Sequence, residues 1–524
     1  MFLTLISALL SILSFPKFSL WPFAWMAFAP IFHLTQRLER MSSAFFYFYL
    51  SGFLFFLVTW EWLRHVTYFG WIALVSLYAI YFGLFGIVVY WFLKRRYFFI
   101  SLFALPSAWA VLEWMRTEIP VWGFGWNLLA YSQSSNPGVS GVASFIGVYG
   151  VSWLIMFVNL VIFFVIHFAQ NRGKTGGVRV LYPIAVLSLI FGLSFLYGKQ
   201  QRMVLQNDGS SIRAAVIQGN IPQEEKWDRE RKASILEIHE QLSRFVSFDE
   251  KPDLIIWPEA AFPGYFNMDQ ERERVIQLER ELQIPILFGS PHLEFPIQDR
   301  EVAYNSAYLV DHRLPVENRY DKVRLVPFGE YVPWRKFFGP LGIERFAYSL
   351  GVSDFERGKD IKVFSLDEKH RFSVLICFED TFPYLSKSAV DRGAQFLVVM
   401  TNDAWFGKSA APYQHLQASV FRAIENGVPV IRAANTGVSA FITNRGEVLD
   451  RVKDQHGHDT FIAGGLVRSV LLGGEKTFYR TRGYQFPLWC LVFVLGSFIV
   501  TLNRRKKGTG KNVYLPRFLG GAKE

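Results

Sequence analysis

The feature that most constrains this chain is the uneven distribution of charge along it. Residues 1 to about 200 form long, almost uninterrupted apolar runs, residues 205–480 carry charges at ordinary globular frequency, and residues 484–502 are apolar again. An α-helix rises about 1.5 Å per residue, so about 20 apolar residues are needed to cross a hydrocarbon core of about 30 Å. In a chain of 524 residues with 51% hydrophobic content, this division predicts a membrane bundle and a globular domain.

Eight apolar stretches reach or approach the length of a membrane span, at residues 2–15, 19–35, 43–60, 69–93, 98–115, 143–168, 180–198 and 484–502. The first is short, and a secretory signal is its alternative interpretation. It lacks a basic start and a clear cleavage site, and another apolar run follows at once, so a retained helix that turns at Pro16 is favoured. The sequence therefore predicts about eight transmembrane helices, seven of them within residues 1–200 and the last at 484–502.

Basic residues gather in alternate loops between these stretches. They follow the second, fourth, sixth and eighth stretches, at Arg37, Arg40, Lys94, Arg95, Arg96, Arg172, Lys174, Arg179 and the segment NRRKKGTGK. The positive-inside rule then predicts that both termini are cytoplasmic, including a basic tail at 503–524, and that residues 205–480 lie across the membrane. The same loops account for much of the net charge of +11, so nucleic acid is excluded as a partner.

The globular region has the pattern of an α/β domain. Seven short apolar runs predict strands, in RAAVIQGNI, DLIIWPEAA, PILFGS, NSAYLVD, FSVLICFED, FLVVMTND and VPVIRAANTG. Apolar residues at helical spacing predict helices between some of them, for example Tyr413, Leu416, Val420 and Ile424 before Asn426 and Gly427. An α/β domain with at least partly parallel sheets should gather its functional groups at the carboxyl ends of strands.

Several chemically unusual residues follow the predicted strands. Glu259, Cys377 and Asn402 each end an apolar run, and Lys322 follows a strand after a short turn. Singly, each has an ordinary structural interpretation: a buried cysteine, a turn acid or a solvated lysine. Two arguments favour a nucleophilic role for Cys377. The only other cysteine, Cys490, lies in a predicted span, which makes a disulfide implausible in an exported domain, and a thiol needs a neighbouring base or cation such as Glu259 and Lys322.

At this point the motifs resemble a known family. WPEAAFP around Glu259, YDKVRLVPFGEYVP around Lys322 and ICFED around Cys377 are similar, in order and spacing, to the Glu, Lys, Cys triad of the nitrilase superfamily. More narrowly, QGNIPQEEKWD, VPFGEYVP and TNDAWFG within the predicted membrane frame resemble the apolipoprotein N-acyltransferase family. The resemblance covers essentially the whole chain and implies a nitrilase-like αββα sandwich on a membrane bundle.

The resemblance also implies an activity. Members of the family move a fatty acyl chain from a phospholipid to the α-amino group of the diacylglyceryl-cysteine of an apolipoprotein, at the periplasmic side of the bacterial cytoplasmic membrane. It implies a ping-pong reaction through a thioester on Cys377, with Glu259 as general base and Lys322 stabilising the oxyanion. We expect no cofactor, because the reaction requires none and no His/Cys cluster has metal-ligand spacing. The expected oligomeric state is a monomer.

Further site residues are carried over from the same motifs. Glu330 and Glu379 match family acids near the triad, Trp227 and Trp405 match aromatics that line the site, and Asn402 belongs to the TNDAWFG motif. Phe378 stands where the family often has tyrosine, so this chain lacks a hydroxyl group at that position.

Two other functions remain alternatives. A membrane-tethered carbon-nitrogen hydrolase would use the same triad, with water as the second nucleophile. A transporter with an exported sensing domain would instead need charged residues inside its spans, where only Glu113, near a span end, stands out.

Two aromatic segments have open roles. Residues 330–351 could form a lid that dips into the membrane interface or an ordinary hydrophobic flap, and the segment VWGFGWN at 121–127 could line a lipid entry or form an interfacial aromatic belt.

Overall fold

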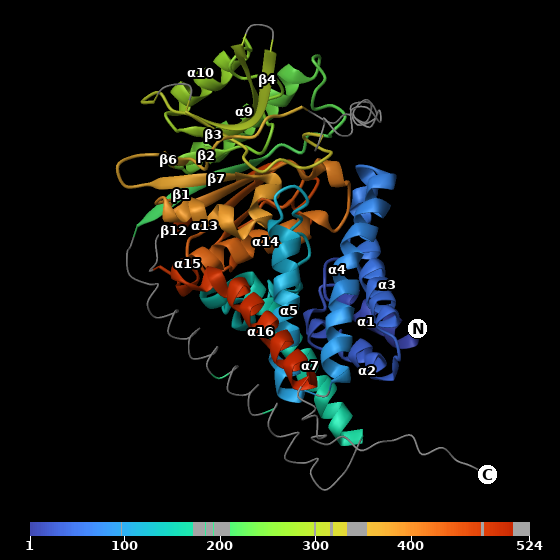
Figure 1. The fold of residues 1–524 in the computed structure, drawn as a ribbon. Helices are drawn as coiled ribbons and strands as arrows, with labels where there is room; N and C mark the ends of the chain where they lie inside the picture. Colours follow the sequence, from blue (N-terminus) through green and yellow to red (C-terminus); the bar gives the residue numbers. More distant parts are fainter. Residues whose placement is uncertain are drawn as a thin grey trace, which may run out of the picture.

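The computed structural model describes residues 1–95, 97–170, 184, 192, 210–297, 300–314, 318–332, 354–472 and 476–506. The chain forms two parts, an α/β part at the top of Figure 1 and a helical part below it. The predicted span at 180–198, apart from two isolated residues, lies outside the described residues. So do residues 333–353, which include most of the predicted lid, and most of the basic tail.

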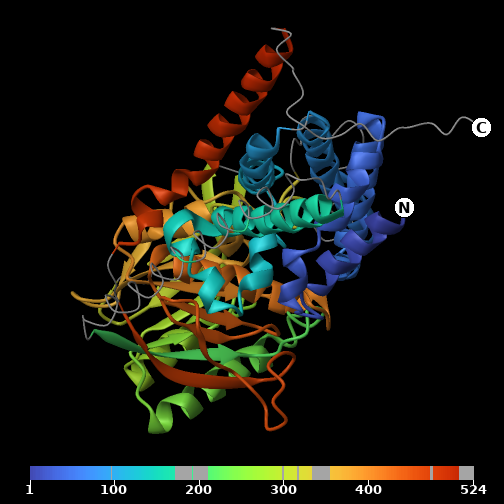
Figure 2. The ribbon, with the colours of Figure 1, turned by 90° about the horizontal axis from the view of Figure 1, so that it is seen from below.

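Five helices in the described part of the chain are long and apolar enough to cross a membrane: Met41–Thr59 (α3), Tyr68–Lys94 (α4), Phe98–Glu118 (α5), Ala143–Gln170 (α7) and Gly483–Asn503, which overlaps α16 (Phe486–Lys506). They coincide with the third to sixth and the eighth predicted spans. Seen from below, α16 lies at the edge of the bundle, away from the N-terminal helices (Figure 2). The chain is a membrane protein, although the predicted count of eight helices is not confirmed.

The prediction of one helix over residues 19–35 is wrong. This stretch forms a short 3-10 helix, Trp21–Trp25 (η1), and then a nine-residue helix, Ala29–Arg37 (α2), and the preceding helix, Phe2–Leu13 (α1), has only 12 residues. Pro22 and Pro30 stand at the starts of η1 and α2. Proline lacks a backbone donor and favours the first turn of a helix, so Pro22 and Pro30 mark two separate helix starts within the apolar run.

Polar side chains bind the backbone where this run is divided. Asn159 of α7 accepts a hydrogen bond from the Phe28 N–H at 2.7 Å and donates to the Ala24 carbonyl at 2.8 Å. The Ser7 hydroxyl of α1 accepts from the Ile31 N–H at 3.1 Å. Lipid offers no hydrogen-bond partners, so non-helical backbone at this depth is stable only with such partners.

The α/β part is a sandwich of two six-stranded sheets. The first has the order β12-β1-β2-β3-β4-β5 and the second the order β11-β10-β9-β8-β7-β6. All seven predicted strands are present, in β1 (Ser211–Gln218), β2 (Leu254–Ile256), β3 (Ile286–Ile297), β4 (Arg300–Val310), β7 (Arg371–Ile376), β8 (Phe396–Thr401) and β9 (Val430–Ala434). The additional strands are β5 (Arg319–Asp321), β6 (Val363–Ser365), β10 (Ala440–Ile442), β11 (Val448–Arg451) and β12 (Gly464–Leu471).

The central strands of both sheets are parallel, as predicted, and the outer strands are antiparallel. β2 pairs in parallel with β1 and β3, and β8 pairs in parallel with β7 and β9. Helices α9 (Lys232–Asp249) and α10 (Arg272–Leu282) cover the first sheet, and α13 (Pro383–Asp391) and α14 (Ala411–Asn426) cover the second (Figure 1). The αββα sandwich implied by the resemblance is therefore confirmed.

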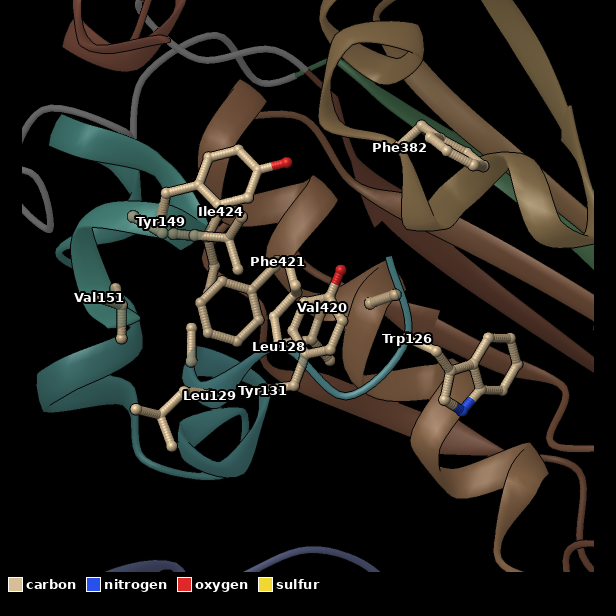
Figure 3. Close-up of a cluster of buried hydrophobic side chains, with 14 of the residues drawn as sticks. Trp126, Leu128, Leu129, Tyr131, Tyr149, Val151, Phe382, Val420, Phe421 and Ile424 are labelled. Atoms are coloured by element: carbon tan, nitrogen blue, oxygen red, sulfur yellow. The ribbon is translucent and has the colours of Figure 1, made fainter. Parts of the chain in front are cut away.

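The second helix layer lies between the sandwich and the membrane bundle. Val420, Phe421 and Ile424 of α14 face Tyr131 and Tyr149 of the membrane part in one buried apolar cluster (Figure 3). Nearly every residue of α14 is buried, unlike the single apolar stripe of the sequence pattern, because one face of the helix covers the sheet and the other meets the bundle. The two parts consequently share one core.

Hydrogen bonds reinforce this contact. The Gln414 side chain accepts from the indole N–H groups of Trp62 and Trp126, at 3.1 and 2.8 Å, and donates to the carbonyls of Pro16 and Thr59. Glu425 accepts from the Val148 N–H at 2.7 Å, beside the Gly147 kink of α7, where φ is 71°.

The remaining short elements are η2 (Glu61–His65), η3 (Leu129–Gln133), α6 (Pro137–Ser140), η5 (Cys377–Thr381), η6 (Asp403–Phe406), α15 (Phe478–Thr481) and η7 (Gly483–Gln485).

Candidate active site

The three residues of the expected triad leave strands of both sheets and meet between them. Glu259 follows β2, Lys322 directly follows β5 and Cys377 directly follows β7. Lys322 Nζ lies 3.5 Å from Glu259 Oε1, and the Cys377 thiol interacts electrostatically with both charged groups. The carboxyl ends of β2 and β7 therefore supply a carboxylate and a thiol to one site, as expected for parallel strands.

Glu259 is held as an acceptor by fixed donors. Its Oε1 accepts from Asn305 Nδ2 at 2.8 Å and its Oε2 accepts from the Asn402 N–H at 2.9 Å. Lys226 Nζ donates to the Glu259 carbonyl at 3.0 Å. Gly289 allows the β2 end to approach β3, because a Cβ atom at Gly289 would lie 2.5 Å from the Ala260 nitrogen. Donors on both oxygens fix the orientation of the carboxylate, as a general base in a defined position requires.

Lys322 is a buried ammonium between two carboxylates. Its Nζ donates to Glu330 Oε1 at 2.8 Å, and the same oxygen accepts from Asn305 Nδ2 at 2.7 Å. Burial by itself would lower the pKa of Lys322, but the carboxylates of Glu330 and Glu259 raise it above its usual range. Lys322 therefore carries a fixed positive charge, which suits a group that stabilises an oxyanion and not one that transfers protons.

Cys377 stands in a strained backbone position at the tip of β7. Its φ of 51° is left-handed, a conformation that costs a non-glycine residue about 1–2 kcal/mol. Burial and the neighbouring Glu259 carboxylate raise the pKa of its thiol well above the usual range, although Lys322 opposes this. The resting group is thus a thiol, which needs a base in place at the moment of attack.

Glu379 ties the nucleophile strand to the loop that carries Lys322. It is fully buried, its Oε2 accepts from the Ile376 N–H at 2.8 Å, and its Oε1 accepts from the N–H groups of Val323 and Arg324 at 2.8 and 3.0 Å. Tyr320 also donates its hydroxyl to this carboxylate at 2.9 Å. Burial raises the pKa of Glu379 to about 7 against the effect of these donors. Glu379 therefore fixes the separation of the strand ends.

Phe378 joins the site to the membrane part. Its ring is buried and lies 5.7 Å from that of Phe124 and 4.9 Å from that of Phe382. Trp126, two residues beyond Phe124, is only 3% exposed and bonds to Gln414, so the aromatic-belt alternative for residues 121–127 is wrong at this residue. The rings of Phe124 and Phe382 pack against Phe378, where this chain lacks a hydroxyl group.

The remaining expected site residues lie at different depths. Asn402 is buried and bonds to Glu259 as described, whereas Trp227 and Trp405 are 51% and 45% exposed.

Sequence reasoning missed Asn305, which bridges Glu259 and Glu330, and Lys226, which follows two acids in QEEKWD. Burial lowers the pKa of Lys226 to about 8. Asn305 had no signal stronger than a polar residue in a strand, whereas Lys226 stands in the QGNIPQEEKWD motif, where no role was assigned to it.

One group in the described residues has side chains near enough for a metal ion: Glu279, Asp311 and His312. It lies on α10 and just after β4, and Asp311 already binds Arg313 through both carboxylate oxygens. The guanidinium competes with a cation for that carboxylate, so this group is explained by its ion pairs.

Comparisons with known proteins match both parts. A family described as the apolipoprotein N-acyltransferase N-terminal domain matches residues 7–161, and one described as carbon-nitrogen hydrolase matches residues 213–464. The apolipoprotein N-acyltransferase of Geobacter metallireducens is 36% identical over 501 residues, covering 93% of this chain and 92% of that protein. That of Chlorobaculum tepidum is 32% identical over 473 residues, covering 84% and 86%.

Among solved structures, a variant of a nitrilase-superfamily amidase from Nesterenkonia is 21% identical and covers 54% of this chain and 98% of its own, with a TM-score of 0.38.

Proposed function

The chain belongs to the apolipoprotein N-acyltransferase family, and we propose that it transfers a fatty acyl chain from a membrane phospholipid to the α-amino group of a diacylglyceryl-modified apolipoprotein. The observation that carries this proposal is the position of the Glu259 carboxylate and the Lys322 ammonium beside the Cys377 thiol. The proposed location is the bacterial cytoplasmic membrane, with the α/β part on the periplasmic side and both termini in the cytoplasm.

In the first half of the proposed reaction, Glu259 takes the thiol proton as the Cys377 sulfur attacks the ester carbonyl carbon of the phospholipid. Lys322 and a backbone N–H stabilise the tetrahedral oxyanion. The intermediate collapses to a thioester, the carbon-oxygen bond to glycerol breaks, and Glu259 returns the proton to the departing lysophospholipid.

In the second half, the unprotonated amine of the lipoprotein attacks the thioester carbonyl. Glu259 accepts a proton from the attacking amine, the carbon-sulfur bond breaks, and the proton regenerates the thiol. The product is an amide, which is more stable than the thioester. Because the Lys322 charge is set by Glu330 and Glu259, it is present in both halves.

A labelling experiment tests the proposal. Purified protein is incubated with phospholipid that carries a labelled acyl chain, and a hydroxylamine-sensitive adduct is measured on the wild type and on Cys377→Ala. We expect label on the wild type only, and discharge of the label by a diacylated lipopeptide. Discharge by water at the same rate would support the carbon-nitrogen hydrolase alternative, and an equal adduct on Cys377→Ala would contradict the assigned nucleophile.

A further inference from the structure

Beneath Cys377 lies a cluster of four buried charged side chains that the proposed mechanism does not use. Asp380 comes from η5, Asp403 from η6, His415 from α14 and Arg432 from β9. Each of them has an exposed fraction of 0%. Ion pairs of this kind are costly to bury unless every member is satisfied, so their position under the nucleophile calls for an explanation.

His415 is the member that touches the nucleophile. Its Nε2 lies 3.2 Å from the Cys377 carbonyl oxygen and 2.9 Å from Asp380 Oδ1, and its Nδ1 lies 3.1 Å from Asp403 Oδ1. A neutral imidazole has one N–H, so both nitrogens can donate only in the imidazolium form. Burial and Arg432 would lower the pKa of His415, but Asp380 and Asp403 raise it above its usual value.

The other members hold the His415 ring in place. Arg432 donates to Asp380 Oδ2 at 3.3 Å and to Asp403 Oδ2 at 3.2 Å. Ser419 donates to Asp380, and Thr401 of β8 donates to Asp403 at 2.8 Å. Each carboxylate is therefore fixed from two sides, and two carboxylates balance two cations. The ring also lies against Trp126, with its centroid 5.0 Å away.

The contact with Cys377 matters because of the conformation of that residue. A left-handed φ is unfavourable for cysteine and persists only where surrounding contacts hold it. The carbonyl of Cys377 is the group whose direction depends on this conformation, and a charged N–H donor is a strong hydrogen-bond partner for it. Asp403 in turn interacts unfavourably with a thiolate at Cys377, and His415 and Arg432 neutralise that charge.

We propose that His415 is a positioning residue for the nucleophile: its Nε2–H, shared between Asp380 Oδ1 and the Cys377 carbonyl oxygen, holds that carbonyl and so maintains the left-handed backbone that presents the thiol to Glu259 and Lys322. The inference rests on the proposed function, because the thiol is taken to be the acyl carrier. His415 is next to Gln414, which binds four segments of the membrane part, so the same helical turn connects the bundle to the nucleophile.

The test compares His415→Gln with His292→Gln, a matched loss of another buried histidine, which bonds to Tyr308 in the first sheet. All proteins carry Cys490→Ala, so that thiol alkylation reports Cys377 alone. Two quantities are measured: the rate of acyl adduct formation as a function of phospholipid concentration, and the pH midpoint of alkylation by iodoacetamide.

For His415→Gln we expect the maximal rate of adduct formation to fall by about tenfold or more, with the half-saturating phospholipid concentration unchanged within about twofold. The alkylation midpoint should rise by about one pH unit, because a positive charge near the thiol is lost. His292→Gln should change neither quantity. An unchanged rate and midpoint in His415→Gln, or equal losses in both variants, would overturn the proposal.

If His415→Gln cannot be recovered in folded form, a second variant, His415→Lys, is used. It keeps the positive charge but lacks the flat ring that reaches both carboxylates and the carbonyl. It should keep the wild-type alkylation midpoint and still lose adduct formation; a wild-type rate would contradict the hydrogen-bond role. If the wild type itself forms no adduct, the proposed function fails, whereas the alkylation measurement still decides whether His415 acts on the Cys377 thiol.

Discussion

The membrane part and the α/β part bury polar side chains in different ways. In the bundle three polar side chains each bind backbone groups of an irregular segment: Asn159 binds the divided second apolar stretch, Glu113 accepts from the Leu129 N–H at 2.7 Å, and Arg116 donates to the carbonyls of Phe124 and Trp126 at 3.2 and 2.9 Å. In the α/β part the polar groups share partners, as when Asp380 and Asp403 both bind His415 and Arg432.

This difference follows from what each part must hold in place. Lipid leaves any irregular backbone without partners, so side chains that bond to the backbone at each break stabilise it. The site needs several strand ends fixed relative to one another, which requires side chains that bond to more than one of them. Substitutions in the bundle should therefore act independently and mainly on stability, whereas those around the site should be coupled and should reduce turnover.

Glu379→Gln should give the largest effect. The amide group would face backbone N–H donors of Ile376 or Arg324, so the strand end and the Lys322 loop would move apart, and a displacement of about 1 Å can cost about 100-fold in rate. The rate of acyl adduct formation by the folded variant measures this loss of rate. Glu240→Gln, which alters a nearly buried carboxylate on α9, is the control. Equal rates in the two variants would show that Glu379 has no special role in holding the strand end and the Lys322 loop together.

Gln414→Leu tests the boundary between the two parts. The indole donors of Trp62 and Trp126 would lose their acceptor, and each buried unpaired donor costs about 1–3 kcal/mol. We expect the rate of acyl transfer from membrane phospholipid to fall by about tenfold. Gln417→Leu, one turn further along α14 and without a hydrogen bond to its side-chain oxygen, should be close to wild type. Equal losses of acyl-transfer rate in Gln414→Leu and Gln417→Leu would show that any substitution on α14 has this effect.

Asn159→Leu should lower stability and leave turnover alone. It removes the partner of the Phe28 N–H, so the free energy of unfolding should fall by about 2 kcal/mol, seen as a lower melting temperature in detergent micelles. Thr35→Val is the control, because the Thr35 hydroxyl bonds only to the carbonyl of Ile31 within regular helix α2, and should cost less than about 0.5 kcal/mol. Reduced activity per folded Asn159→Leu molecule would contradict independent action in the bundle.

Lys226 should give a pH dependence of stability. Its pKa is lowered by burial from 10.5 to about 8 in the folded protein. Between these values the unfolded chain binds the proton and the folded chain does not, so this group makes stability rise as pH increases from about 8 to 10.5. The melting temperature of the wild type should rise over this range by a few degrees relative to that of Lys226→Met. Parallel curves for the two proteins would show that Lys226 titrates normally.

The fold was predictable where the sequence pattern is local. Continuous apolar runs identified every central strand, because a strand buried on both faces has no polar positions. The edge strands β5 and β6 are three residues each and carry no such pattern. The second apolar stretch was wrongly predicted as one helix, because its apolar composition was given more weight than Pro22 and Pro30, which mark where it divides.

The site was predictable only as far as motifs reach. Glu259, Lys322 and Cys377 stand in recognisable sequence contexts, and the structure brings them together. Asn305 lies in the middle of β4, where a polar residue usually indicates an exposed position, and His415 becomes informative only when α14 is packed against η5 and η6. Contacts across many residues of chain cannot be read from local spacing.

The burial of α14 on both faces has a practical consequence for protein production. A soluble fragment that began near residue 210 would expose Val420, Phe421 and Ile424, together with the indole-binding Gln414, to water. Such a fragment should aggregate or bind detergent, and Phe378 and His415 beside its nucleophile would lack their contacts with Phe124 and Trp126. Inhibitor screening against this enzyme therefore calls for the whole chain in a lipid environment, since side chains packed against neighbours of the nucleophile come from outside the sandwich.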